Sequence, residues 1–136
     1  MSMLNIFNVS GSAVSAQSQR LNVVASNLAN VDAVAGPDGK AYKARQVVFQ
    51  TQLMGEVGAA GVTVSNVTED QTPGRKVHDP QNPQADADGF VTYSNVNAVE
   101  EMVNMISASR SYQNNVEVMN TAKSLLMKTL QMGQGG

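Results

Sequence analysis

The 136-residue chain contains no cysteine, no tryptophan and a single histidine. Without cysteine, disulfides and thiolate metal sites are excluded, and one histidine cannot build a three-histidine zinc site. The sequence also lacks any run of about eighteen apolar residues, the length that a membrane-spanning helix needs. These shortages remove several common kinds of functional site, and we expect no cofactor, no metal centre and no direct membrane span.

Charge is scarce and nearly balanced. Lysine and arginine number 9 against 11 acidic residues, and residues 1–31 carry only Arg20. No basic patch indicates a nucleic-acid partner or an anionic membrane. The N-terminal residues lack both a basic segment and a continuous apolar segment, so we expect no cleaved secretory signal.

Proline is confined to the middle of the chain, and the two ends are amphipathic. Residues 4–31 have Gly11 as their only helix-weakening residue, and residues 98–132 contain neither glycine nor proline. In both stretches apolar residues recur every seven positions, the spacing that turns one stripe of a helix toward a partner helix. The front rows are Phe7, Val14, Leu21 and Leu28, with Val24 and Val31 three residues further on. The back row is Met105, Tyr112, Met119 and Leu126, with Val116 beside it.

The limits of the back helix are marked in the sequence. Asn97 can cap its N-terminus, Glu100 follows three residues later as in a capping box, and Gly133 comes after the last periodic residue. The front helix is rich in asparagine, which has low helix propensity. At 1.5 Å per residue the two helices are roughly 40 to 50 Å long. An elongated pair of helices is therefore expected.

The middle of the chain has the composition of loops and strands. Turn residues predict a surface loop around Pro37, and β-forming residues predict strands within 42–53, 61–68 and 90–93. A polar connector is expected from Thr72 to Pro83. The predicted fold is mainly α with a small β segment, its terminal helices packed as an antiparallel coiled-coil-like pair with a β-containing middle insertion. Its three parts are residues 1–31, 32–97 and 98–136.

No residue pattern indicates catalysis. As a general base, His78 needs a positioned nucleophile and an orienting group, and its sequence neighbourhood supplies neither. We interpret His78 as solvated or turn-bonded. Asp86 and Asp88 resemble part of a calcium loop, but Gln84 and Asn95 then occupy the first and twelfth ligand positions. A hairpin turn is the preferred interpretation of this segment.

Two asparagines near the end of the front helix have two possible roles. Asn27 and Asn30 lie three residues apart, next to the apolar pair Leu28 and Val31. Their amides can donate and accept hydrogen bonds across a subunit boundary. They can also simply end the helix, as asparagine often does. The composition leaves both interpretations open.

One segment resembles a known signature. Residues 20–32 read RLNVVASNLANVD, which resembles the N-terminal signature of the bacterial flagellar rod, hook and hook-associated proteins. Residues 79–91 and 95–123 are similar to the short proximal-rod members of that family. Ala33 departs from the signature, which usually has threonine or serine there. The resemblance implies terminal helices that form an inner tube, with the β-containing segment on its outer side.

The resemblance further implies a structural, non-enzymatic subunit of the proximal rod of the flagellar basal body. Such a subunit self-assembles through its terminal helices, transmits torque and encloses the export channel. The implied partners are copies of itself, other rod proteins, the membrane-ring adaptor at the rod base and the flagellar type III export apparatus. Export without signal cleavage and a place in the rod within the periplasm are also implied.

An alternative function is a soluble helical-hairpin adaptor or secretion chaperone, in which the same apolar rows pair within one monomer. In the rod interpretation these rows and the nearby amides form an assembly interface. Its predicted members are Phe7, Val14, Leu21, Val24, Asn27, Leu28, Asn30, Val31, Met105, Tyr112, Val116, Met119 and Leu126.

Overall fold

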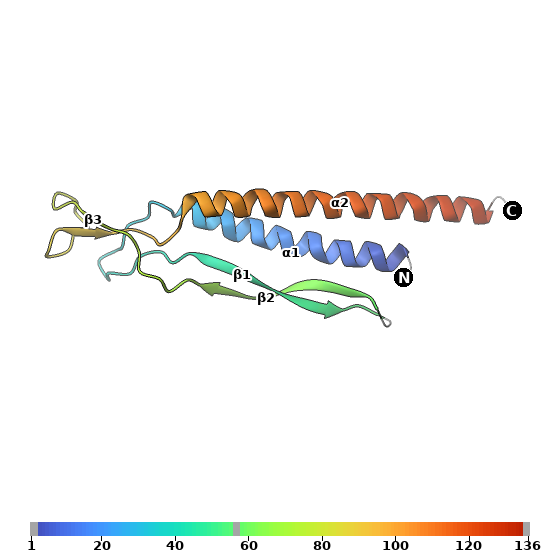
Figure 1. The fold of residues 1–136 in the computed structure, drawn as a ribbon, viewed down its shortest axis with the longest axis horizontal. Helices are drawn as coiled ribbons and strands as arrows, with labels where there is room; N and C mark the ends of the chain where they lie inside the picture. Colours follow the sequence, from blue (N-terminus) through green and yellow to red (C-terminus); the bar gives the residue numbers. More distant parts are fainter. Residues whose placement is uncertain (1–2, 56–57, 135–136) are drawn as a thin grey trace.

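A computed structural model describes residues 3–55 and 58–134 of the chain. Two long helices, α1 (Met3–Ala29) and α2 (Ala98–Gln134), lie side by side and run in opposite directions (Figure 1). A small β region lies between them in sequence. The predicted fold class, a terminal helix pair with a β-containing middle segment, is confirmed.

The helix α1 occupies the middle of the arrangement. It packs against α2 on one side and against a β-hairpin on the other (Figure 1). The hairpin consists of β1 (Arg45–Leu53) and β2 (Ala60–Glu69), paired antiparallel with an irregularity between Val48 and Phe49. The position of α1 means that both neighbours depend on it for their place in the molecule.

The hairpin approaches α1 closely at Gly61. The backbone N of Val62 donates a hydrogen bond of 3.1 Å to the hydroxyl oxygen of Ser12 on α1. A Cβ atom at position 61 would lie 2.6 Å from that same oxygen. A side chain at position 61 would therefore require Ser12, Met54 or the hairpin to shift.

A second two-stranded sheet pairs β3 (Lys76–His78) with β4 (Phe90–Thr92). The strand β3 lies in the segment predicted as a polar connector, so that prediction was wrong for these three residues. So short a strand has little pattern of its own and is defined by its pairing with β4. His78 is solvent-exposed as expected, with its ring 5.0 Å from that of Phe90.

The segment before β4 forms the predicted turn. Gly89 has a positive φ of 83°, a conformation that glycine adopts without steric cost. The carboxylate of Asp86 accepts hydrogen bonds of 2.9 Å from the backbone N of Asp88 and of Phe90. The hairpin-turn interpretation of this segment is confirmed.

The predicted limits of α2 agree with the structure to within a few residues. The side-chain oxygen of Asn97 accepts hydrogen bonds from the backbone N of Val99 at 3.1 Å and of Glu100 at 3.2 Å, which confirms the cap. Gly133 does not stop the helix, which continues to Gln134.

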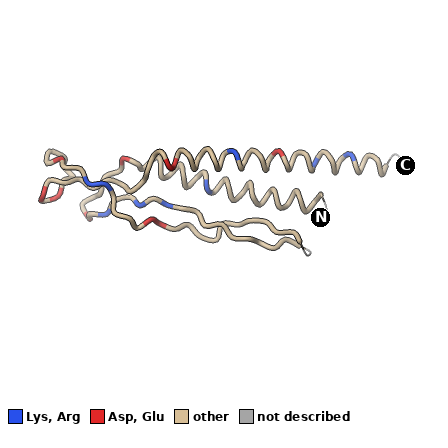
Figure 2. Tube along the Cα trace, viewed as in Figure 1, with Lys and Arg blue, Asp and Glu red and all other residues tan. Residues whose placement is uncertain are grey.

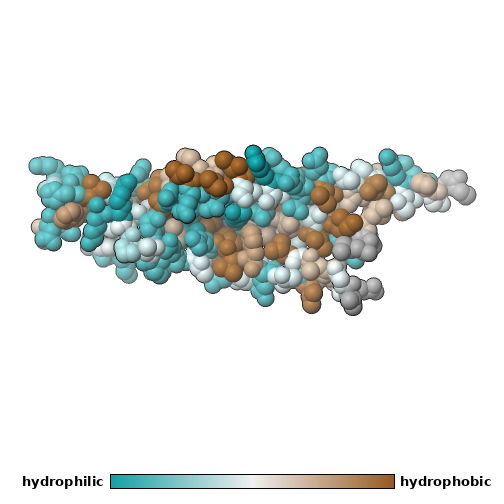
Figure 3. All heavy atoms as spheres, viewed as in Figure 1, coloured by the Kyte–Doolittle hydropathy of each residue, from teal (hydrophilic) through white to brown (hydrophobic). Residues whose placement is uncertain are grey.

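The core is thin and made of small side chains. The buried apolar residues are Ala16, Val24, Ala35, Ala44, Ala59, Val91, Ala108 and Ala122. Twenty large apolar side chains are exposed among the residues that the structure describes. Figure 3 shows such hydrophobic groups in several places on the visible face. So much exposed apolar surface is typical of a protein that meets a partner.

We expect Gly11→Ala to stabilise the isolated chain by about 0.5–1 kcal/mol, because glycine inside a helix is less favourable than alanine. The added Cβ would lie 3.6 Å from the terminal methyl of Met119, an ordinary packing distance. Urea unfolding followed by circular dichroism measures the change. Gly61→Ala is the matched control and should destabilise. A loss of stability in Gly11→Ala would mean that α1 and α2 lie too close together at this point to admit a methyl group.

Candidate assembly surface

The most deeply buried positions of α2 recur every seven residues. Glu101, Ala108 and Ala122 are buried, and Asn115, in the same row, is partly buried. On α1 the buried residues include Ser10 and Val24. Apart from Val24 these side chains are small or polar, so they bury little apolar area.

The predicted apolar rows lie beside this contact. Phe7 is 37% exposed, Met105 39% and Tyr112 36%. Other predicted members are partly buried, namely Val14, Leu21, Leu28, Asn30, Val31, Val116, Met119 and Leu126. Val24 and Asn27 are buried. More than a third of the surface of Phe7, Met105 and Tyr112 therefore remains uncovered in a single chain, whereas the other row members are more extensively buried.

Asn27 joins α1 to the β-hairpin. It is 0% exposed, and its amide nitrogen donates a 2.8 Å hydrogen bond to the backbone O of Arg45. Its amide oxygen accepts hydrogen bonds of 2.9 Å from the backbone N of Arg45 and from the hydroxyl of Tyr42. The Tyr42 hydroxyl also lies 3.0 Å from that of Ser26. The amide of Asn27 is thus used within the chain, where it joins α1 to β1 and to Tyr42.

Asn30 bonds at the end of the helix, which is the second of the two roles that the sequence left open. Its amide nitrogen donates a 2.8 Å hydrogen bond to the backbone O of Ser26, in the last turn of α1. Its backbone N bonds to the same oxygen at 3.2 Å and to that of Asn27 at 3.1 Å. Asn30 therefore takes up carbonyl groups that a helix end leaves without partners.

Asn95 forms a second junction, which the sequence did not reveal. Its amide nitrogen donates to the backbone O of Asp70 at 2.7 Å and of Thr72 at 2.9 Å, while its oxygen accepts from the backbone N of Ala44 at 2.6 Å. The hydroxyl and the backbone N of Thr72 donate to the Asp70 carboxylate and lower the pKa of Asp70. The only sequence signal for Asn95 was its place in a segment that resembles the rod proteins.

A polar cavity of about 560 Å³ lies between α1, α2 and β1. It is lined by Arg20, Arg45 and Glu101, among others. Arg20, the one charged residue of α1, donates a hydrogen bond of 3.4 Å to the side-chain oxygen of Asn104 on α2. The cavity therefore combines both signs of charge at the start of α2.

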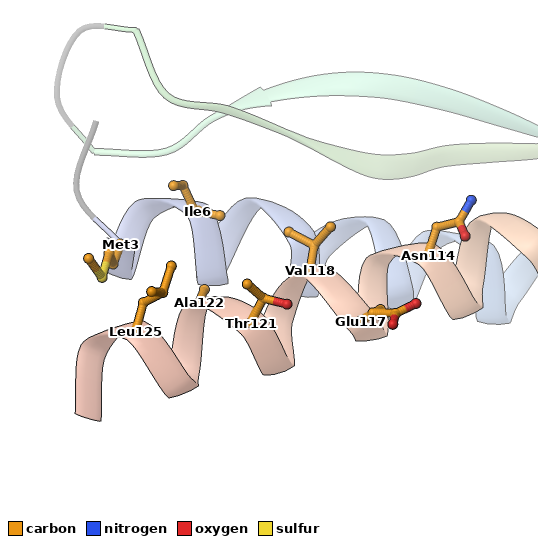
Figure 4. Close-up of a pocket in the computed structure, with 8 residues that line it drawn as sticks. All are labelled: Met3, Ile6, Asn114, Glu117, Val118, Thr121, Ala122 and Leu125. Carbon is orange, nitrogen blue, oxygen red and sulfur yellow. The ribbon is translucent and has the colours of Figure 1, made fainter. Parts of the chain in front are cut away.

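An apolar groove of about 470 Å³ lies at the other end of the helix pair (Figure 4). Met3 and Ile6 of α1 form one side of it, and α2 forms the other. Val118, Leu125 and Met132 of α2 recur every seven residues and are all exposed. The seven-residue spacing of this third row, which was not predicted, is suited to packing against another helix.

The chemistry of the described residues is that of packing surfaces. They include no group of three or more histidine, cysteine or acidic side chains placed to hold a metal ion. None of the described helices combines enough length and hydropathy to cross a membrane. What the two helices do present is apolar side chains in rows along their exposed faces.

Comparison with known proteins identifies the family of the chain. Residues 7–37 match the family model described as flagella basal body rod protein, and residues 87–132 match the C-terminal model of the flagellar basal body rod FlgEFG proteins. Flagellar basal-body rod protein FlgC is 58% identical in Escherichia coli, 57% in Salmonella typhimurium strain LT2 and 59% in Yersinia enterocolitica. Each of these matches covers 98% of this chain and 100% of the relative.

The fold and these matches define a structural component of the flagellar basal-body rod. Within this class, the chain belongs to the FlgC family of rod proteins. The resemblance found in residues 20–32, 79–91 and 95–123 is thereby confirmed.

We expect Asn27→Ala to destabilise the chain by about 1–3 kcal/mol, because two backbone groups of Arg45 and the Tyr42 hydroxyl lose their hydrogen bonds to this buried amide. Asn30→Ala is the matched control, and its effect should be smaller because Asn30 is partly exposed. Urea unfolding of the two variants measures the difference. Equal stability of Asn27→Ala and the unchanged chain would mean that the hairpin is not held by this amide.

Proposed function

We propose that this chain is a self-assembling subunit of the proximal rod, which transmits torque along the rod and encloses the export channel. Its terminal helices form the assembly interface and its β region lies outside the tube. The role is mechanical and includes no reaction. The membership of the FlgC family supports the place in the rod, and the exposed rows on the helices support the self-assembly.

The single observation that carries the proposal is the uncovered apolar surface along both helices. Within one chain, α1 and α2 meet through small and polar side chains, while Phe7, Met105 and Tyr112 each keep more than a third of their surface exposed. Burying apolar area yields about 25 cal/mol per Å². Neighbouring subunits that cover these rows would therefore gain stability that the single chain lacks.

The proposed interface keeps the residues predicted from the sequence, with two changes of role. Val24 and Asn27 are buried within the chain, so they hold the subunit in shape. The half-buried members along the edges of the helix pair contact neighbours directly. Asn30 has both roles. Its amide nitrogen bonds to a carbonyl group in the last turn of α1, and its side chain remains partly exposed to a neighbour.

The proposed partners are copies of the chain, other rod proteins, the membrane-ring adaptor at the rod base and the type III export apparatus that delivers the subunit. The proposed location is the rod within the periplasm, reached by export without cleavage of a signal. The relatives named FlgC support the association with rod proteins. The other partners rest on the resemblance alone.

A soluble helical-hairpin adaptor or secretion chaperone is the second candidate. It is favoured by one observation, because α1 and α2 do pair within one chain. An adaptor whose apolar rows were covered within its own helix pair would not expose so many large apolar side chains along the same helices. Purified basal bodies separate the two functions, since a rod subunit is retained in them and an adaptor is not.

We expect Tyr112→Ala to impair assembly more than it impairs the single chain. A large side chain buried between subunits contributes about 2–5 kcal/mol, whereas Tyr112 is already 36% exposed in one chain. The variant is expressed in a strain that lacks the gene. The measurements are swimming in soft agar, the amount of the chain in purified basal bodies, and circular dichroism of the isolated variant.

The neighbouring exposed residue provides the matched control, Gln113→Ala, which should leave motility and yield unchanged. Normal basal-body yield and normal swimming of Tyr112→Ala would place Tyr112 outside the interface. Loss of helix content in the isolated variant would instead assign its effect to the fold of the single chain.

A further inference from the structure

Two exposed apolar patches lie at opposite ends of α2. The front patch comprises Val99, Met102, Val103 and Ile106, each more than half exposed. Figure 3 shows hydrophobic side chains gathered over these first turns of the helix. The end patch comprises Met127 and Leu130, also more than half exposed. The two patches offer similar chemistry at a distance along the same helix.

The end patch lies where α2 has no neighbour among the described residues. Leu125 is the last residue of α2 that lines the groove with Met3, near the beginning of α1. Beyond it, α2 extends past the start of α1 as a single helix (Figure 1). An amphipathic helix end without a packing partner is marginal in water, so this part of α2 gains most from another chain.

The chain's own helix pair covers neither patch. The row that faces α1 contains Glu101, Ala108 and Ala122. At 100° per residue, the front patch lies roughly 100 to 200° around the helix from Glu101, the nearest residue of that row. The front patch therefore points away from α1, while the end patch lies on the part of α2 that extends past the start of α1.

The charges beside the patches are opposite in sign. Glu100 is exposed next to the front patch, while Lys123 and Lys128 are exposed next to the end patch. Figure 2 shows acidic residues at the start of α2 and basic residues toward its end. Each end of α2 thus carries charge opposite in sign to that at the other end of α2 in a second copy.

We propose that the end patch of one copy packs on the front patch of a second copy, with both α2 helices pointing in the same direction. This inference rests on the proposed function. A stagger of about 24 residues, roughly 36 Å along the helix, brings Met127 opposite Val103 and Leu130 opposite Ile106. The same stagger brings both lysines of one copy close to Glu100 of the second copy.

The common direction follows from the need to keep adding subunits. Two helices that point in opposite directions use both patches of both copies, which closes the assembly at a dimer. A head-to-tail contact leaves one patch free at each end, so it propagates into a ring or a helical filament. A subunit of an extended rod requires the second arrangement.

Engineered cysteines test the contact directly, because the natural chain contains none. Val103→Cys and Met127→Cys are introduced into the same chain, at positions too far apart on one helix to join each other. Basal bodies are purified from a strain that carries the variant, oxidised, and separated by mass without reductant. The matched control combines Val103→Cys with Thr129→Cys, which continues the row that faces α1.

We expect a ladder of dimers, trimers and larger species in the test variant, and at least a fivefold weaker ladder in the control. Products that stop at the dimer would show the antiparallel pairing and overturn the inference. A cross-link to a different rod protein, without self-cross-links, would overturn the second copy as the partner. An absent cross-link in basal bodies that contain the variant overturns the contact but leaves the proposed function intact. Absence of the unchanged chain from purified basal bodies would overturn both the contact and the proposed function.

Charge exchange provides an independent measurement. Glu100→Lys alone, or Lys123→Glu together with Lys128→Glu, should weaken incorporation into basal bodies, since one exposed ion pair changes an association constant by about two- to fivefold. All three changes together should restore incorporation. A triple variant no better than the weaker of its two parents would show that these charges do not meet.

Discussion

The hydrogen bonds of Asn27 are the interaction on which the arrangement depends. A single buried amide holds the first residue of β1 through both its backbone N and its backbone O, and holds Tyr42 as well. Because α1 lies between α2 and the hairpin, this junction fixes the β region relative to the helix pair. At the same end of the hairpin, Asn95 bonds the residue before β1, Ala44, and the residue after β2, Asp70. Hydrogen bonds of two asparagines therefore hold the parts of this chain together, since it has no large apolar core.

Small and large side chains occupy different positions in the helix pair. Alanine, serine and polar residues occupy the closest approach, while the larger apolar side chains lie along the edges and stay partly exposed. A single subunit consequently holds its shape mainly through close packing and hydrogen bonds. The apolar area that would normally stabilise a core remains available at the surface, where neighbouring subunits can cover it.

Local sequence patterns were sufficient to predict the helices. The features that these patterns did not predict depend on contacts between residues far apart in the sequence. Seven-residue spacing and the cap at Asn97 defined α2, because both depend on residues close in sequence. The same spacing could not show that Ala108, rather than Tyr112, lies at the centre of the contact, since that depends on how closely the helices approach. The strand β3 and the roles of Asn27 and Asn95 depend on partners many residues away. The family resemblance supplied the function that the residue patterns left open.

The scarcity of charge on α1 also affects how the subunit responds to its surroundings. Among the described residues, the ion pair that the fold makes is the exposed one between Arg45 and Glu69, which joins the two strands of the hairpin. Packing and neutral hydrogen bonds are screened little by salt, whereas exposed ion pairs are weakened by it. The shape of each subunit should thus be indifferent to ionic strength. Any sensitivity to salt would be confined to the joints between subunits.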